Sequence, residues 1–472
     1  MDEIKQHLAT LLSDSDPAAR RRAAEGLATC TGFAPVAALA AALRDENKGV
    51  RDAALRSLSQ IGNKNVARAV VEYLGDTNIT TRNLAAELLM RLRDQSLEAL
   101  LPSLYDANQD VRKFVVDILG VNGSTDAVPH LIKLFADPDE NVVISAVEAL
   151  GNIRSESAIP ALTAAFNDIA YARATTAEAI GKIGGTKATE FLLSQINTLI
   201  ADPTSDPLVL YALLEAIGQI GYDKAFFELS NHISRVKGKL RRILLHAIIR
   251  IGERCTLTME NVEVVKQDLI EALKDKNAAI QVSAVKGLAN VEGEDVTTAL
   301  LEAVNRSEEC DAVLCPILEY REGAFQVMVN DLESGKITPT KEVIGLMGRL
   351  VSRIEYAAIP KELIESDGRL LQRAFDAVKG AWNEATEDLR AVIVDTLFRL
   401  DGDQAIQVLD AIVDEPDPWL RIHVIELLAP LTDRRIPEFI GRFMNDEDEM
   451  VRDVAASTLA GRGESFNMLT SV

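Results

Sequence analysis

Apolar residues recur along this chain at the spacing of an α-helix rather than of a β-strand. In the segment LFADPDENVVISAVEALGNI (134–153), Val142, Ala146 and Leu150 share one helical face. The Asp-Pro-Asp turn before them supplies turn and N-cap chemistry, and Gly151 is expected to cap the end of the helix. We therefore expect each such segment to hold two antiparallel helices joined by a short polar turn.

An arginine returns every 30 or 31 residues within this pattern, and an aspartate stands six residues before most of these places. The arginines are Arg20, Arg51, Arg82, Arg112, Arg173, Arg390, Arg421 and Arg452, and Val143 occupies a skipped place. The aspartates are Asp14, Asp45, Asp76, Asp106, Asp137, Asp275 and Asp446. A fixed polar pair at this period is typical of stacked two-helix units. The sequence therefore predicts an all-α fold, an α-solenoid of roughly 11 to 14 helical pairs without a β-sheet.

The repeated Asp–Arg pair is interpreted as a structural ladder. On a helical wheel the arginine lies at the flank of the buried face, near the seam between units. From there its guanidinium can reach the turn aspartate of its own unit or of a neighbouring one. We expect these contacts to stabilise the stack rather than to bind a ligand.

Four segments share a signature: a leucine, an aspartate-containing turn, Val-Arg, a small residue and a second leucine. They are LRDENKGVRDAALRSL (43–58), LYDANQDVRKFVVDIL (104–119), LKDKNAAIQVSAVKGL (273–288) and MNDEDEMVRDVAASTL (444–459). This signature resembles the HEAT-like repeats of the type first described in phycobilisome lyases. The resemblance implies a superhelix of stacked HEAT-like helical hairpins. It is strong over 8–195, looser over 207–305 and strong again over 386–462.

The repeat signature divides the chain into five parts. We expect an N-terminal HEAT-like array (1–200), looser HEAT-like repeats (201–305), a diverged helical segment (306–385), C-terminal HEAT-like repeats (386–462) and a tail (463–472). The diverged segment keeps helical apolar spacing but loses the Asp and Val-Arg signature. Either diverged repeats or a distinct interaction module would explain this pattern.

The net charge of the chain limits the class of partner that it is expected to bind. With 72 acidic and 50 basic residues, the formal net charge is −22. Such a surface repels phosphate backbones and anionic lipids, so we expect neither nucleic acid nor membrane as a partner. A basic segment of another protein fits better. The start MDEIKQHLATLL resembles no secretory signal, and four scattered cysteines show no paired spacing, so a cytoplasmic location is expected.

No catalytic or metal-binding pattern is visible in the sequence. The five histidines are scattered, none is followed by glutamate, and none pairs with another at helical spacing. Phosphate-binding loops, nucleophile elbows and dinucleotide-binding glycine motifs are likewise missing. We therefore predict a protein that is not an enzyme and has no metal, cofactor or catalytic residue.

One set of polar residues recurs on the outward face of the second helix of each unit, five residues after the ladder arginine. It comprises Glu25, Glu87, Asp117, Glu148, Glu178, Asp395 and Glu426, with Glu215 in the matching place of a looser unit. Arg56, Lys286 and Ser457 interrupt the series. The resemblance implies that second helices line a concave surface, so these carboxylates are predicted to form a partner-binding column. A solvated helix face, rich in glutamate as a helix former, is the alternative interpretation.

These observations favour a non-catalytic protein–protein interaction scaffold or adaptor that presents an acidic concave groove to a basic partner segment. The alternative that the resemblance implies is a bilin lyase subunit or a chaperone-like tetrapyrrole carrier. Such a site would gather aromatic residues on the concave face, whereas Trp382 and Trp419 lie outside the regular N-terminal array. The oligomeric state is not specified by any of these patterns.

Overall fold

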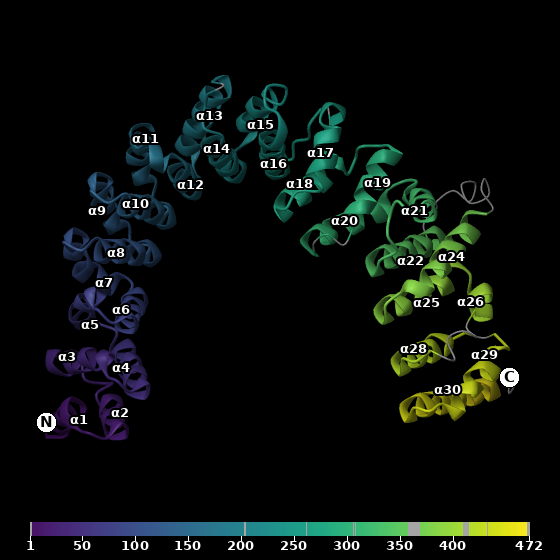
Figure 1. Cartoon of the computed structure of the whole chain (residues 1–472), viewed down its shortest axis with the longest axis horizontal. Coiled ribbons are helices and arrows are strands. Elements are labelled where there is room, and N and C mark those ends of the chain that lie inside the picture. Colours follow the sequence, from purple (N-terminus) through teal and green to yellow (C-terminus); the bar gives the residue numbers. More distant parts are fainter. Residues whose placement is uncertain are drawn as a thin grey trace. The chain divides into compact units, whose positions relative to one another are not determined.

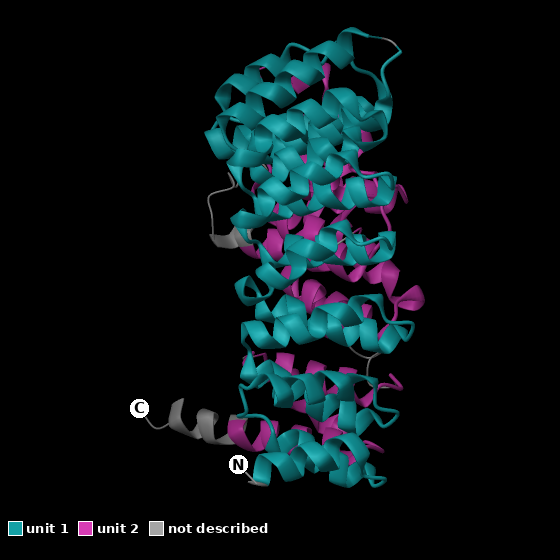
Figure 2. Ribbon diagram, turned by 90° about the vertical axis from the view of Figure 1, so that its left-hand side faces the viewer, with its two compact units in different colours: residues 1–259 teal, residues 260–472 magenta. Residues whose placement is uncertain are grey.

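The computed structural model describes residues 2–202, 204–260, 262–304, 306, 308–356, 369–408, 415–431 and 433–469. Contacts within the chain divide it into two compact units, residues 1–259 and 260–472 (Figure 2). Each unit is a stack of helical pairs. In the described residues there is no β-strand, so the predicted all-α solenoid is confirmed.

Unit 1 contains eight helical pairs, each made of a first and a second helix. The pairs are α1 (Asp2–Ser13) with α2 (Pro17–Gly26), α3 (Phe33–Ala41) with α4 (Lys48–Ile61), α5 (Lys64–Val70) with α6 (Ile79–Leu92), α7 (Asp94–Leu100) with α8 (Gln109–Asn122), α9 (Val128–Lys133) with α10 (Glu140–Ile153), α11 (Ile159–Asp168) with α12 (Arg173–Ile183), α13 (Thr186–Ala201) with α14 (Pro207–Ile220), and α15 (Asp223–Ser230) with α16 (Gly238–Cys255). Several first helices end in a short 3-10 turn, such as η5 (Leu134–Ala136) before α10.

Unit 2 contains six such pairs in its described part. They are α17 (Lys266–Ala272) with α18 (Ala278–Leu288), α19 (Glu294–Ala303) with α20 (Glu308–Tyr320), α21 (Ala324–Glu333) with α22 (Lys341–Tyr356), α24 (Leu370–Gly380) with α25 (Glu387–Leu400), α26 (Gly402–Val408) with α28 (Pro418–Leu428), and α29 (Ile436–Arg442) with α30 (Glu449–Leu469).

The helices of each unit form two layers. In unit 1 the second helices pack on one another, α8 on α10 and α10 on α12, while the first helices pack in their own layer, α3 on α5 and α5 on α7 (Figure 1). Aliphatic side chains fill the space between the layers; Leu119 and Leu150, for example, are fully buried. Each such leucine stabilises the stack by roughly 1.5–3 kcal/mol.

The turn inside each pair has a regular hydrogen-bond pattern. The Asp45 carboxylate accepts the backbone N–H of Asn47 at 2.9 Å, and the Asn47 side chain then caps α4 by accepting the N–H of Gly49 at 2.9 Å. The same two-step pattern recurs at Asp76, Asp106, Asp137, Asp275 and Asp446, each with an Asn or Asp two residues later. The repeated aspartate therefore begins the second helix as well as facing the ladder arginine.

Gly151 does not cap its helix, so that prediction was wrong. Helix α10 continues to Ile153, and Arg154 takes the left-handed cap conformation with φ 57°. A Cβ added at Gly151 would stand 2.8 Å from the Cα of Ala179 on the next second helix. The same approach recurs for Gly120 on Ala149, Gly181 on Ala216 and Gly218 on Ala247. Glycine is needed here because two helix backbones come close together.

The diverged segment continues the two-layer packing of unit 2. Helix α20 packs on α18 and α22, and α21 packs on α19 and α24. Pro316 stands inside α20 without ending it. This packing favours diverged repeats over a distinct interaction module.

Candidate interaction surfaces

The proposed carboxylate column places six side chains on second helices of unit 1 and two on second helices of unit 2. In unit 1 they lie on α2, α6, α8, α10, α12 and α14, and in unit 2 on α25 and α28. The second helices of unit 1 form one layer (Figure 1), so the six residues of unit 1 lie in the same layer of helices. Their local surroundings differ, and this difference separates the column into three groups.

The first group is neutralised by cations on the same helix. Glu25 pairs with Arg21 at 3.0 Å. Glu87 pairs with Arg91 at 2.6 Å, and the Asp117 carboxylate pairs with Lys113 at 2.8 Å. A second cation, Arg56 on α4, lies 3.5 Å from Glu25. Because these pairs are partly exposed, each stabilises its helix by only about 0.3–0.5 kcal/mol, but each also lowers the local negative charge.

The second group consists of Glu148 on α10 and Glu178 on α12. Both side chains are exposed, and neither has a charged partner within the described part of the chain. Their helices pack closely through Gly151 and Ala179. Lys182, one turn after Glu178, donates to the Asn152 side chain at 3.1 Å. Neither carboxylate of this group is therefore compensated by an ion pair in the described residues.

The third group is Glu215 on α14, which is partly buried. Its Oε1 atom lies 4.0 Å from Nε2 of His246 on α16. Burial raises the pKa of Glu215, and the nearby Arg250 only partly opposes that effect. Burial, together with the nearby charge of Arg250, lowers the pKa of His246 to about 4. His246 is therefore neutral at physiological pH, and Glu215 lies in a drier site than Glu148 or Glu178.

The two column residues in unit 2 also differ from each other. Asp395 on α25 lies 2.9 Å from Nε2 of His423 on α28. This hydrogen bond raises the pKa of His423 more than burial lowers it. Glu426, on the same helix as His423, is exposed.

The ladder arginines bind their own turn and, at some units, the next one. Arg112 donates from Nε and from Nη2 to the Asp137 carboxylate, both at 2.8 Å, and from Nη1 to the Asp106 carbonyl at 2.9 Å. Arg20 makes the same three contacts with the Asp45 carboxylate and the Asp14 carbonyl. Each of these arginines thus links two consecutive helical pairs of unit 1.

Other ladder arginines reach backbone carbonyls of their own turn. Arg51, Arg82 and Arg452 donate to the carbonyls of Asp45, Asp76 and Asp446 respectively, each at 2.7 Å. Arg173 donates to the carbonyls of Phe166 and Asn167 at 3.0 and 3.2 Å. Where glutamine replaces arginine, Gln281 makes the equivalent bond to the Asp275 carbonyl at 2.7 Å.

In unit 2 the ladder includes a glutamate that the sequence pattern did not indicate. Arg390 pairs with the carboxylate of Glu415, whose backbone carbonyl accepts from Arg421. Arg421 also donates to the Asp446 carboxylate at 2.9 Å. Glu415 stands six residues before Arg421, where most units have aspartate. Glu415 could therefore have been predicted as a ladder residue from its position six residues before the arginine, although it is not an aspartate.

Two buried carboxylates of the ladder are held in their charged form. Burial alone would raise the pKa of Asp137, but hydrogen bonds from Arg112 and from the Asp139 N–H outweigh it and the pKa is lowered. Asp45 has the same balance, with Arg20 and the Asn47 N–H as donors.

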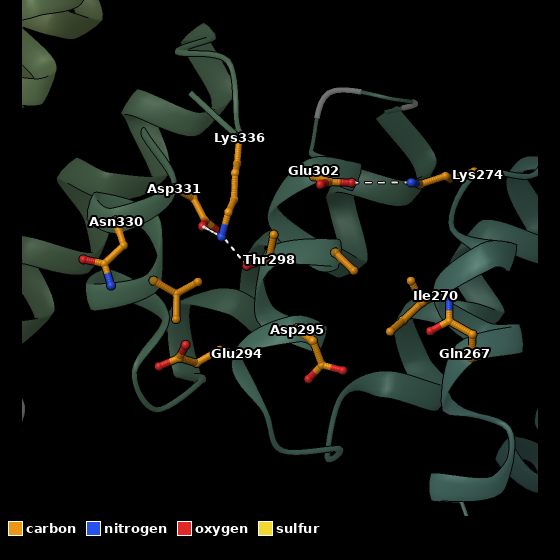
Figure 3. A pocket seen from close by; sticks show the side chains of 12 residues that line it. Gln267, Ile270, Lys274, Glu294, Asp295, Thr298, Glu302, Asn330, Asp331 and Lys336 are labelled. Carbon is orange, nitrogen blue, oxygen red and sulfur yellow. Dashed lines mark hydrogen bonds and ion pairs between the residues drawn. The ribbon is translucent and has the colours of Figure 1, made fainter. Parts of the chain in front are cut away.

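Unit 2 also has a polar cavity of about 600 Å³ between α17, α19 and α21 (Figure 3). Asp331, almost fully buried, accepts from the Thr298 hydroxyl at 2.6 Å and lies 3.3 Å from the Lys336 amine. Lys274 and Glu302 form a pair at 3.6 Å on the opposite side of the cavity. These charges are satisfied within the protein, so the cavity resembles a solvated cleft between neighbouring helical pairs of unit 2. Asp331 is not visible in the sequence pattern because it lies where the repeat signature is lost.

Two kinds of feature are absent from the residues that the structure describes. No group of three or more His, Cys, Asp or Glu side chains could hold a metal ion there. Within the same residues no helix combines the length and apolar character needed to cross a bilayer.

Comparison with known proteins identifies the repeats. Residues 4–94 and 97–171 match the family model described as HEAT repeats. Over these residues the chain is similar to HEAT repeats. The match covers the part of unit 1 in which the Asp–Arg period is most regular, so the predicted HEAT-like array is confirmed there.

A curated relative comes from Pseudanabaena tenuis (strain PCC 7409), the uncharacterized phycocyanin operon protein Z. It is 28% identical to this chain in an alignment of 186 residues that covers 36% of this chain and 91% of that protein.

Two solved structures have a similar fold. A mutant of Kap121p has a TM-score of 0.53 at 12% identity, covering 97% of this chain and 56% of that chain. Kap121p bound to Pho4p has a TM-score of 0.53 at 11% identity, covering 97% of this chain and 57% of that chain. This chain thus spans a little more than half the length of Kap121p, and the likeness concerns the fold alone.

Proposed function

We propose that this protein is a non-catalytic interaction scaffold that binds a basic segment of a partner protein on the second-helix face of unit 1. HEAT repeats build extended surfaces typical of such scaffolds. The six column carboxylates of unit 1 are its candidate contacts, with Glu148 and Glu178 at its centre. Asp395 and Glu426 lie in unit 2 and stay a separate prediction.

One observation carries this proposal. Glu148 and Glu178 are exposed on closely packed neighbouring helices and have no charged partner in the described residues. Glu25, Glu87 and Asp117 occupy the same register but already pair with cations. A basic segment would therefore gain most from the two unpaired carboxylates, because their charge is not yet compensated.

The experiment measures binding of a fluorescein-labelled oligoarginine peptide to the full chain at increasing salt. The test variant is Glu148→Lys with Glu178→Lys. The matched control is Asp126→Lys with Glu190→Lys, which makes the same charge change at exposed positions outside the second-helix layer. We expect the test variant to weaken binding about tenfold and the control less than about twofold. Equal losses would mean that net charge alone attracts the peptide, and the proposed face would be wrong.

The similarity to the phycocyanin operon protein Z supports a second candidate function, that of a bilin lyase subunit or tetrapyrrole carrier. Incubating the purified full chain with a bilin and recording visible absorption tests it. A stoichiometric, shifted absorption band that survives gel filtration would support this function, and an unchanged spectrum of the free pigment would exclude it.

The expectation that the chain is not an enzyme stays a prediction. Catalytic hydrolysis of a nucleotide by the purified protein would contradict it. Elemental analysis that found stoichiometric zinc or iron would contradict the separate prediction that the chain holds no metal.

A further inference from the structure

The segment that leads into α16 has the opposite charge to the equivalent segments of unit 1. The turns before α2, α4, α6, α8, α10 and α14 contain Asp14, Asp45, Asp76, Asp106, Asp137 and Asp206. The sequence RVKGKLRR (235–242) contains five basic residues and no acidic one. In a chain of net charge −22 this reversal is local and strong.

Three of these cations are free to meet a partner. Arg235, Lys237 and Lys239 are exposed, and none of them forms an ion pair in the described part of the protein. Arg241 and Arg242 follow in the first turns of α16 and are half-buried. Burial lowers the pKa of the neighbouring His232; Arg235 lowers it further, and Glu228 partly opposes this.

The arrangement does not serve the stability of α16. The first turn of α16 has no acidic residue, and no side chain caps its N-terminus. Cations near a helix N-terminus oppose the helix dipole and therefore destabilise the helix, most strongly at low salt. The helix is held instead by its buried face, which includes Leu244, Ile248 and Ile251. A binding role would explain why the cations are present.

The surroundings of the cluster select a short ligand. Asp202 and Asp206, exposed at the preceding turn, would repel a long polyanion that continued past the cluster. A duplex carries charge along its whole length and would meet these carboxylates. A few carboxylates on a flexible peptide can contact the cations alone. We propose that residues 235–242 bind a short acidic segment of a partner protein, at a site separate from the carboxylate column.

The experiment uses the full chain and a fluorescein-labelled oligoglutamate peptide, followed by fluorescence anisotropy at increasing salt. The test variant is Arg235→Glu, Lys237→Glu and Lys239→Glu. The matched control is Lys5→Glu, Lys133→Glu and Lys187→Glu, exposed residues of the first-helix layer. Both variants change the net charge equally, and circular dichroism checks that both remain helical.

We expect wild type and control to bind the peptide with affinities within about twofold, and the test variant to bind at least about tenfold more weakly. Equal losses in the two variants, or no binding by wild type, would overturn the proposal. Tighter binding of a short DNA duplex than of the peptide would overturn it in favour of nucleic acid. Self-association of wild type that the test variant abolishes would overturn it in favour of a second copy of the chain.

Discussion

The stack from α8 to α14 in unit 1 and the stack from α19 to α24 in unit 2 have the same two-layer packing but different polar contacts. In the first, Arg112 links two turns, and glycines such as Gly151 let second helices approach closely. In the second, neither feature recurs in regular form. The two-layer packing therefore depends on the apolar pattern of the helices and not on the repeated polar pair.

In the second stack, the polar contacts between neighbouring helical pairs differ from one pair to the next. Arg321 donates to the Thr297 hydroxyl at 2.7 Å and to carbonyls at the end of the preceding pair. Arg373 on α24 bonds the Asn330 side chain on α21 at 2.7 Å. The Thr396 hydroxyl on α25 reaches the Ile344 carbonyl on α22 at 3.1 Å. In the second stack, each contact between neighbouring helical pairs therefore has its own hydrogen bonds, whereas in the first stack the Asp–Arg pair recurs.

The largest expected effect is that of Arg112→Ala. The substitution leaves the Asp137 carboxylate, whose side chain is only 5% exposed, without its bidentate partner. Removing one member of a buried pair costs several kcal/mol, and we expect about 3 kcal/mol. Hydrogen exchange of α8 and α10, with chemical denaturation of the full chain, measures it. A loss below about 1 kcal/mol would show that the contact contributes no more than an exposed pair.

A somewhat smaller effect is expected for Gly151→Ala. The new Cβ would lie within 2.8 Å of the Ala179 backbone, so α10 and α12 must separate. Overpacking of this kind costs about 1–3 kcal/mol. The control is Gly380→Ala in α24, where a Cβ would meet nothing within 4 Å. That change should be neutral or stabilise by up to about 1 kcal/mol. Similar effects of both substitutions would mean that close approach is not the role of Gly151.

Arg82→Ala should destabilise less than Arg112→Ala. Arg82 donates to the carbonyls of Asp76 and Thr77, which water can reach once the side chain is removed. We expect a loss of about 1 kcal/mol, as for a single hydrogen-bonding group. Partner binding should change little, because Arg82 does not belong to the column. Equal losses for Arg82→Ala and Arg112→Ala would show that the contact between units adds nothing.

The smallest expected effect is a loss of ladder stability in unit 1 at acid pH. The pKa values of Asp45 and Asp137 are lowered in the folded protein, so their contribution is complete above the ordinary carboxyl pKa. It is lost as the pH falls through the lower folded value. Hydrogen exchange should therefore show α4 and α10 losing protection on acidification. In Asp137→Asn the acid-dependent part of the loss at α10 should decrease, and an unchanged profile would assign it to other groups.

The sequence alone could have predicted which carboxylates of the column pair with a cation and which do not, for most of the column. Arg21, Arg91 and Lys113 stand four residues from Glu25, Glu87 and Asp117 respectively, a spacing at which helical side chains meet. Glu148 lacks such a neighbour, and its isolation is therefore visible in the sequence. The burial of Glu215 beside His246 was not visible, because it depends on how α14 and α16 pack.

The sequence by itself determined the helical pairs, their period and the positions of Asp and Arg in each turn. These properties arise from helix geometry and local hydrogen bonding, which act over a few residues. Tertiary structure alone decided that Arg112 pairs with Asp137, that Gly151 lies against Ala179 and that Asp331 is buried with Thr298. Those contacts join residues about one repeat apart or more, and they depend on the distance and rotation at which neighbouring units pack. A periodic pattern predicts that units stack, but it does not determine which atoms meet at each seam.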